Sequence, residues 1–226
     1  MMKNIIITGT NGMIGNLILN YCFNRSDVNI ITSITRKKTD IVHPKLIEVL
    51  HDNFLDFTNV KEYFKNQQIC FYCLGVYTGQ VPKEEFNKIT VDYTKCFAEE
   101  LRRCNNETVF CFLSGQGADS KEKSRIMFAR DKGIAENILL KLNFKKTYIF
   151  RPGYIYPVTP RKEPNFIYRL MRILYKIFFK IFPEMGVTSE KLAKTMVEVA
   201  FQQGEQVIFE NKRIRLFNLY DVVVNK

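Results

Sequence analysis

Short, mostly apolar runs recur along this chain and are separated by longer stretches with helical spacing. The apolar runs span residues 3–8, 28–34, 46–50, 69–74, 109–113 and 147–150. Runs of this length between turn residues are typical of buried strands. Apolar positions that recur with the helical period predict helices at residues 12–23, 58–65, 84–103 and 121–142. Strands that alternate with helices predict a parallel sheet with right-handed crossovers.

The predicted fold class is α/β: a Rossmann-type doubly wound parallel sheet with a small C-terminal extension of helices and a strand. A chain of 226 residues is long enough for one buried core, and no stretch has the composition of a linker. We predict one domain over residues 1–226, with residues 155–226 as a substrate-side extension. Ligands of such sheets bind beyond the carboxyl ends of the strands. The residues expected along that crevice are Thr8, Arg36, Asp52, Leu74, Ser114 and Arg151.

Three glycines follow the first predicted strand in the pattern G-x-x-G-x-x-G, at Gly9, Gly12 and Gly15. Gly9 allows a tight turn, Gly12 lets backbone N–H groups approach a pyrophosphate, and Gly15 lets the first helix pack closely on the strand. The phosphates would then meet the positive end of a helix dipole. This predicts a dinucleotide site at the start of the chain. Its residues are Gly9, Thr10, Asn11, Gly12, Met13 and Ile14.

The end of the second strand selects between the two nicotinamide cofactors. An acidic residue there would hold the adenosine ribose 2′-hydroxyl, whereas a basic residue accommodates a 2′-phosphate. Arg36 and Lys37 occupy that position and favour NADP(H) over NAD(H), although a solvated turn would have the same composition. Asp52 and Asn53 follow the third strand. Asp52 is suited to accept a hydrogen bond from an adenine amino group, or else to cap a helix.

Further short motifs lie at strand ends and on helices. They are Cys73-Leu74-Gly75, Val91-Asp92-Tyr93, Leu113-Ser114 with Gly117-Ala118-Asp119, Lys132-Gly133 with Glu136, and Arg151-Pro152-Gly153. With the glycine motif they resemble the atypical short-chain dehydrogenase/reductase superfamily, whose NAD(P)-binding Rossmann proteins are also catalogued with the NAD-dependent epimerases/dehydratases. Within it, the sequence is most similar to the Tat-interacting oxidoreductase-like group. The resemblance covers roughly residues 3–200.

The resemblance implies roles for individual residues. Lys132 would hold the nicotinamide ribose hydroxyls, Ser114 would contact a substrate carbonyl, and the loop 152–155 would close over the nicotinamide. A solvated lysine and a serine bonded to backbone are the plain alternatives. The residues that the resemblance assigns to the cofactor are Leu74, Gly75, Lys132, Pro152, Gly153, Tyr154 and Ile155.

The chain departs from the family pattern at Phe128. The family uses Tyr-x-x-x-Lys on one helix with a Ser after the fifth strand; Ser114 and Lys132 match, but phenylalanine replaces the tyrosine. The i, i+4 spacing keeps residues 128 and 132 on one helical face. Phenylalanine has no proton to donate, and a positioned general acid contributes about 10²- to 10⁴-fold in rate. The tyrosines that follow strand ends and could replace it are Tyr77, Tyr154 and Tyr156, although a packed or interface tyrosine is the plainer interpretation of each.

Two functional hypotheses follow from this departure. The first is an NADP-dependent oxidoreductase or epimerase-like enzyme that acts on a small molecule with a substituted proton donor. The second is a catalytically weak NADPH-binding sensor or protein-interaction module. No metal site is expected in either.

The formal net charge is +11, from 34 Lys and Arg against 23 Asp and Glu. The basic residues are scattered and no zinc-finger, RNP or basic-zipper pattern accompanies them, so nucleic-acid binding is not favoured. Residues 165–182 place four basic side chains on one stripe of an otherwise apolar helix. Burial against the sheet, a homodimer contact, a substrate lid and peripheral membrane contact all stay open for this segment.

The six cysteines lie within predicted strands and helices, which is not the loop framework of a disulfide-stapled domain. Cys70 and Cys73 have redox spacing, but on a strand their side chains point to opposite faces, so we expect core cysteines. No secretory leader or membrane-spanning segment is predicted. We therefore expect a reduced, cytoplasmic protein.

Overall fold

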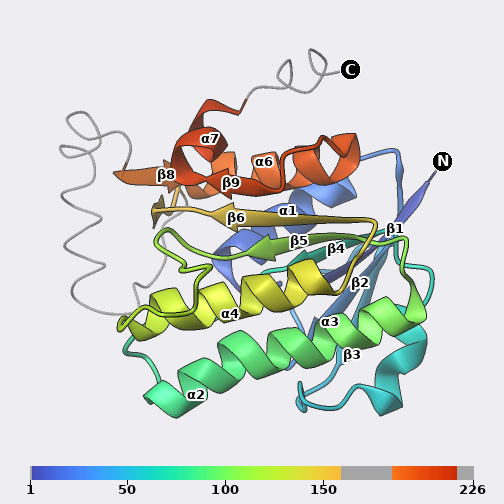
Figure 1. The fold of residues 1–226 in the computed structure, drawn as a ribbon. Coiled ribbons are helices and arrows are strands. Elements are labelled where there is room, and N and C mark those ends of the chain that lie inside the picture. The colour runs from blue at the N-terminus through green and yellow to red at the C-terminus, as the bar shows by residue number, and fades with distance from the viewer. Residues whose placement is uncertain (1, 159–184, 218–226) are drawn as a thin grey trace.

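The computed structural model describes residues 2–158 and 185–217. Within these ranges seven strands form one sheet in the order β3-β2-β1-β4-β5-β6-β9, parallel throughout. Their bounds are β1 Lys3–Thr8, β2 Val28–Thr35, β3 Leu46–Leu50, β4 Ile69–Tyr72, β5 Val109–Leu113, β6 Lys146–Arg151 and β9 Ile208–Glu210. The strand order reverses between β1 and β4, which confirms the predicted doubly wound Rossmann-type sheet (Figure 1).

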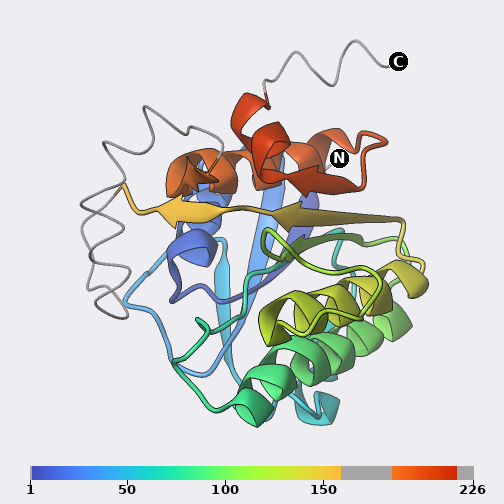
Figure 2. The same ribbon diagram turned by 60° about the vertical axis from the view of Figure 1, so that its left-hand side comes forward.

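Helices cover both faces of this sheet. Their bounds are α1 Met13–Phe23, α2 Lys83–Asn87, α3 Tyr93–Cys104, α4 Met127–Lys141, α6 Ser189–Gln202 and α7 Asn211–Leu216, with a 3-10 helix η1 Thr58–Phe64 and a π-helical turn η2 Lys88–Asp92. Helices α1 and α6 pack on one face, whereas η1, α3 and α4 pack on the other (Figures 1 and 2). Each face therefore has its own apolar cluster.

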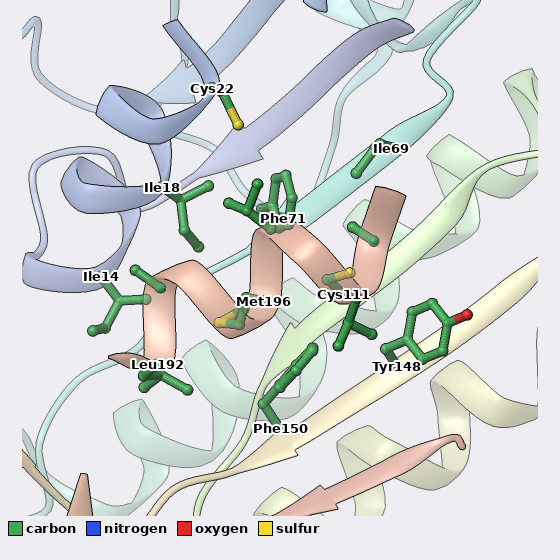
Figure 3. Packing of buried hydrophobic residues seen from close by; sticks show 14 of the residues in the cluster. Ile14, Ile18, Cys22, Ile69, Phe71, Cys111, Tyr148, Phe150, Leu192 and Met196 are labelled. Atoms are coloured by element: carbon green, nitrogen blue, oxygen red, sulfur yellow. The ribbon is translucent and has the colours of Figure 1, made fainter. Parts of the chain in front are cut away.

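Consecutive strand residues alternate between the two clusters because strand side chains point to opposite faces. Ile5 and Ile7 pack with α1 and α6, whereas Ile6 packs with α3 and α4. Figure 3 shows how α6 is held, with Met196 among the strand residues Phe71, Cys111 and Phe150, and Leu192 on the side of Ile14 of α1. Strands covered on both sides can be almost wholly apolar, which is why the apolar runs locate them so well.

The two cysteines with redox spacing also separate by face, as expected. Cys70 is buried in the α3 and α4 cluster, whereas Cys73 packs against the α1 and α6 cluster. All six cysteines are free thiols. Cys73 lies just beyond the end of β4, and its side chain is only partly buried.

The predicted start of the fourth long helix is wrong: α4 begins at Met127, six residues after the expected position 121. Asp119 explains the difference. Its carboxylate accepts hydrogen bonds from the backbone N–H groups of Lys121, Lys123 and Ser124, at 2.9, 2.8 and 2.7 Å. A side chain that satisfies these donors stabilises a loop in place of the first helical turns.

The C-terminal part adds a two-stranded parallel sheet, formed by β7 Tyr154–Tyr156 and β8 Gly186–Thr188. The loop expected to close over the cofactor is thus partly a strand. Residues 165–182, and with them the expectations of membrane contact, a lid or a dimer contact through that segment, lie outside the described residues. Of the helices that are described, none is both long and apolar enough to cross a membrane.

Gly133 offers a test of how tightly α4 packs on the Asp119 loop. A Cβ at position 133 would lie 1.9 Å from the Asp119 carbonyl oxygen. We expect Gly133→Ala to lower the free energy of unfolding by about 1–3 kcal/mol, because backbone must shift. This loss should appear although alanine is the better helix former by about 1 kcal/mol. Urea unfolding followed by circular dichroism measures it.

Gly75→Ala is the matched control, because a Cβ there would meet nothing within 4 Å. The urea concentration at the midpoint of unfolding should be close to the wild-type value for Gly75→Ala. Equal midpoints for the two variants would show that the α4 contact is looser than the structure indicates.

Candidate functional site

A cleft of about 800 Å³ opens beyond the carboxyl ends of the central strands, where the strand order reverses. Its lining comes from residues 12–14 after β1, 73–77 after β4, 113–117 after β5, Phe128 and Lys132 of α4, and 152–155 after β6. Segments far apart in sequence therefore meet at one edge of the sheet. This is where the alternation of strands and helices predicts a ligand site.

The structure brings together most, but not all, of the residues that the sequence predicts for the site. Those that line the cleft are Gly12, Met13, Ile14, Leu74, Gly75, Ser114, Phe128, Lys132, Pro152, Gly153, Tyr154 and Ile155. Those outside its lining are Gly9, Thr10, Asn11, Arg36, Lys37, Asp52 and Asn53, together with Thr8 and Arg151 from the expected crevice. Most of these residues either belong to the glycine turn or lie around the ends of β2 and β3, whereas Arg151 is the last residue of β6.

The glycine turn is shaped by close backbone contacts. Gly9 has φ +76°, and a Cβ there would lie 2.6 Å from the Cys73 carbonyl oxygen. A Cβ at Gly15 would lie 2.2 Å from the carbonyl oxygen of Gly9, so α1 packs directly on the turn. No acidic residue occupies the first turn of α1. The amino end of α1 is thus free of a competing carboxylate and faces the cleft through Gly12, an arrangement suited to an anion.

Asn11 ties this turn to the end of β2. Its side-chain amide donates to Thr35 Oγ1 at 3.1 Å and to the Lys37 carbonyl oxygen at 2.8 Å. Thr10 Oγ1 and Ser33 Oγ form a further hydrogen bond of 2.8 Å. The basic pair at positions 36 and 37 is exposed and is held beside the glycine turn by these bonds.

The segment after β3 adjoins the same place. The backbone N–H of His51 donates to the Thr35 carbonyl oxygen at 2.9 Å. Asp52 and Asn53 are exposed, and Asn53 Oδ1 accepts from the Leu55 N–H at 3.2 Å. Asp52 therefore lies next to the end of β2 but outside the cleft lining. The helix-cap role is wrong, because the next helix, η1, begins at Thr58 with Phe57 as its N-cap residue; the adenine contact stays a prediction.

Ser114 is bound to a buried ion pair. Its hydroxyl donates to Glu136 Oε1, and Glu136, which is 1% exposed, also accepts from Arg151 Nε at 3.0 Å. Arg151 reaches Glu210 Oε1 at 2.9 Å with Nη1, and its hydrogen bond with Glu136 raises the pKa of its guanidinium. The hydroxyl hydrogen that was expected to meet a substrate carbonyl is thus directed to a carboxylate. Arg151 likewise serves this pair and not the crevice.

Lys132 is buried at the base of the cleft, with 8% of its surface exposed. Its Nζ donates to the Leu113 carbonyl oxygen at 3.1 Å and lies 4.9 Å from the centre of the Phe112 ring. Burial lowers the pKa of the amine to about 8, against an opposing effect of Glu136. The amine is therefore still mainly protonated at pH 7, with a neutral fraction of about one tenth.

Phe128 shares the helical face of Lys132, as the spacing predicts, and both side chains line the cleft. Its ring packs on Gly115 so closely that a Cβ at position 115 would lie 2.5 Å from Phe128 Cζ. The ring of Phe86 is 6.3 Å away, measured between centroids. The absence of a side chain at Gly115 thus leaves room for the ring.

Several lining residues were not predicted from the sequence. They are Cys73, Val76, Leu113, Gly115, Gln116 and Gly117. The glycines at 115 and 117, just after a buried strand, are the signal that could have revealed them. Tyr77 and Tyr154, two of the three candidate donors, also line the cleft, whereas Tyr156 does not.

Asn211, at the start of α7, carried no signal in the sequence. It is 2% exposed, and its Oδ1 accepts from the Gly153 N–H at 2.9 Å while its Nδ2 donates to the Gly186 carbonyl oxygen at 3.3 Å. It thereby fixes the segment after β6 against β8. Only the folded arrangement brings these three residues together.

Comparisons with known proteins agree with this picture. No family model matches the chain. Protein HTATIP2 of Rattus norvegicus is 27% identical over 222 residues, which cover 94% of this chain and 88% of the relative. The resemblance to the atypical short-chain dehydrogenases/reductases is confirmed.

Solved structures support the fold. The Bordetella bronchiseptica enzyme WbmH, in complex with NAD⁺, matches with a TM-score of 0.67 and 17% identity over 93% of this chain and 75% of its own. A short chain dehydrogenase family protein from Francisella tularensis matches with a TM-score of 0.66 and 14% identity, over 94% of this chain and 99% of its own.

The ion pair beneath Ser114 can be tested by mutation. Glu136→Gln should lower the free energy of unfolding by about 3 kcal/mol, because the partly buried guanidinium of Arg151 loses the buried one of its two charged partners. The control is Glu205→Gln, which breaks an exposed pair with Lys146 and should cost less than about 1 kcal/mol. Chemical denaturation of both variants gives the comparison. If both variants lose less than about 1 kcal/mol of unfolding free energy, the contact with Glu210 alone is enough to compensate the charge of Arg151.

Proposed function

We propose that this protein is an atypical short-chain dehydrogenase/reductase-like protein that binds NADP(H) in the cleft and reduces carbonyl compounds only slowly. The observation that carries the proposal is the composition of the cleft. It keeps the glycine turn and Lys132 but has Phe128 at the proton-donor position. Binding of the cofactor and catalysis of hydride transfer are thereby separated.

The residues present fit a dinucleotide. The amino end of α1 offers backbone N–H groups and a positive dipole to the pyrophosphate, and Lys132 would hold the nicotinamide ribose. The described lining of the cleft contains no carboxylate that would repel the phosphates. When bound, the cofactor supplies a hydride. The complex of WbmH with NAD⁺ supports a dinucleotide in this fold, and the NADP preference rests on the basic end of β2.

The hydrogen-bond and proton donors expected from the family pattern are missing or already bound, which fits slow reduction of a carbonyl group. Hydride transfer to a carbonyl creates an oxyanion that needs a hydrogen-bond donor and then a proton. Phe128 offers neither, and the Ser114 hydrogen is bound to Glu136. The site therefore lacks both donors that the family pattern provides, which favours a cofactor sensor or an interaction module over an efficient reductase.

A second candidate is an active oxidoreductase or epimerase-like enzyme with a substituted proton donor. It is favoured by the two tyrosines, Tyr77 and Tyr154, that line the same cleft. A phenol from either could replace the missing one.

The free thiols fit the further proposal of a reduced, cytoplasmic environment for this protein.

The cofactor proposal predicts a preference that calorimetry can measure. NADPH should bind at least about tenfold more tightly than NADH, because a charge-assisted contact to the 2′-phosphate is worth about 1.5–3 kcal/mol. Arg36→Ala should remove most of this difference, and Lys141→Ala, which removes the same charge from an exposed site on α4, should leave it unchanged. Equal affinities in the wild type, or a preference that survives Arg36→Ala, would contradict the assignment.

The loss of the phenol predicts a gain of function. Phe128→Tyr should create or raise carbonyl-reductase activity with NADPH over a panel of aldehydes and ketones, because Lys132 stabilises the ionised phenol. The ring tip, Cζ, is the atom that packs on Gly115, so the ring must shift to make room for the added oxygen, at a cost of about 1–3 kcal/mol in stability. Phe128→Leu is the control and should gain nothing.

The turnover rate of the wild-type protein distinguishes the slow-reductase proposal from the active enzyme with a substituted proton donor. Turnover near the common enzyme rate of about 10 s⁻¹ would overturn the slow-reductase proposal. Loss of that turnover in Tyr77→Phe or Tyr154→Phe would then identify the substituted donor.

A further inference from the structure

The amine of Lys132 is buried without a carboxylate of its own. Among the described residues, no carboxylate oxygen lies within salt-bridge distance of its Nζ, and the acceptor it uses is the neutral carbonyl oxygen of Leu113. Glu136, one turn further along the same helix, is bound to Arg151 and accepts from Ser114. The positive charge of the protonated amine is therefore not compensated by a direct carboxylate contact, which disfavours the charged form.

The surroundings of this amine suit a small uncharged ligand. Lys132 is the one charged side chain in the described lining of the cleft. Around it the lining is mainly apolar, with Leu74, Leu113, Phe128 and Ile155. An apolar cleft with one reactive polar group at its base is the arrangement that holds a small organic molecule in a fixed orientation.

We propose that Lys132 is a site of imine formation, at which its amine condenses with a small, uncharged aldehyde that enters the cleft. The nitrogen attacks the carbonyl carbon and a C=N double bond forms. The carbonyl oxygen leaves as water with the two hydrogens of the amine, so no oxidant or reductant is needed. Because the same amine is expected to hold the cofactor ribose, the adduct and the cofactor exclude each other; that consequence alone rests on the proposed function.

The protonation of Lys132 supports this chemistry. Burial lowers its pKa to about 8, and the groups that oppose this effect are Glu136 on α4 and the Cys73 thiol beyond β4. At pH 7 the neutral fraction of such an amine exceeds that of an exposed lysine, with a pKa near 10.4, by about 200-fold. Since only the neutral amine attacks, the rate should rise with pH and level off above about pH 8.

Reductive trapping tests the proposal. The protein is incubated at pH 7 with benzaldehyde and cyanoborohydride, and benzylated lysines are located by peptide mass spectrometry. Lys141, exposed on the same helix, is the internal reference. Lys132 should be labelled at least about tenfold faster than Lys141, given the difference in neutral fraction. Lys132→Arg should remove the fast label, and Lys141→Arg should keep it.

Equal labelling of the two lysines, or a rate that keeps rising through pH 10, would overturn the imine site. The wild-type comparison holds even where Lys132→Arg fails to fold. Saturating NADPH should slow labelling of Lys132 and leave Lys141 unaffected. Fast labelling that NADPH does not slow would count against the proposed cofactor position while it supports the imine site, so the two proposals fail separately.

Discussion

The buried ion pair between Glu136 and Arg151 is the interaction on which the chemistry of the cleft depends. It joins α4 to β6, reaches β9 through Glu210, and receives the hydroxyl of Ser114 after β5. A buried carboxylate must be compensated, and here the guanidinium and the serine hydroxyl together do so. The direction of the Ser114 hydrogen follows from that need. A structural requirement of the core thus decides what the cleft can offer to a ligand.

The same reasoning extends to Lys132 and Phe128. Since Glu136 is already bound to Arg151, it gives the lysine no direct counter-charge, and burial becomes the largest effect on the lysine pKa. The phenylalanine contributes an apolar wall where the family pattern has a phenol, and Gly115 leaves space for its ring. The three positions of the expected catalytic set are therefore all present, in an altered electrostatic setting.

Much of the fold could be predicted from sequence because it rests on local pattern. Apolar runs located the strands of the large sheet up to β6 within two residues at each end, and the glycine spacing located the turn that α1 packs against. What could not be predicted depends on contacts between distant segments. The partner of Ser114, the role of Asn211 and the pairing of β7 with β8 each join residues at least 22 apart. The late start of α4 came from one carboxylate, Asp119, whose effect on the loop no helical periodicity reveals.

Under the proposed function, cofactor binding and catalysis would depend on different parts of this cleft, so a chain could keep one and lose the other. The predicted phosphate site consists of backbone, held by Gly9 and Gly15, where an added Cβ would clash with neighbouring backbone. Such a site tolerates changes in neighbouring side chains, because it uses N–H groups and a helix dipole. Proton transfer, by contrast, depends on one hydroxyl at one position. Replacement of a phenol by a phenyl ring removes a single oxygen, so the packing around α4 and the shape of the cleft can persist without it.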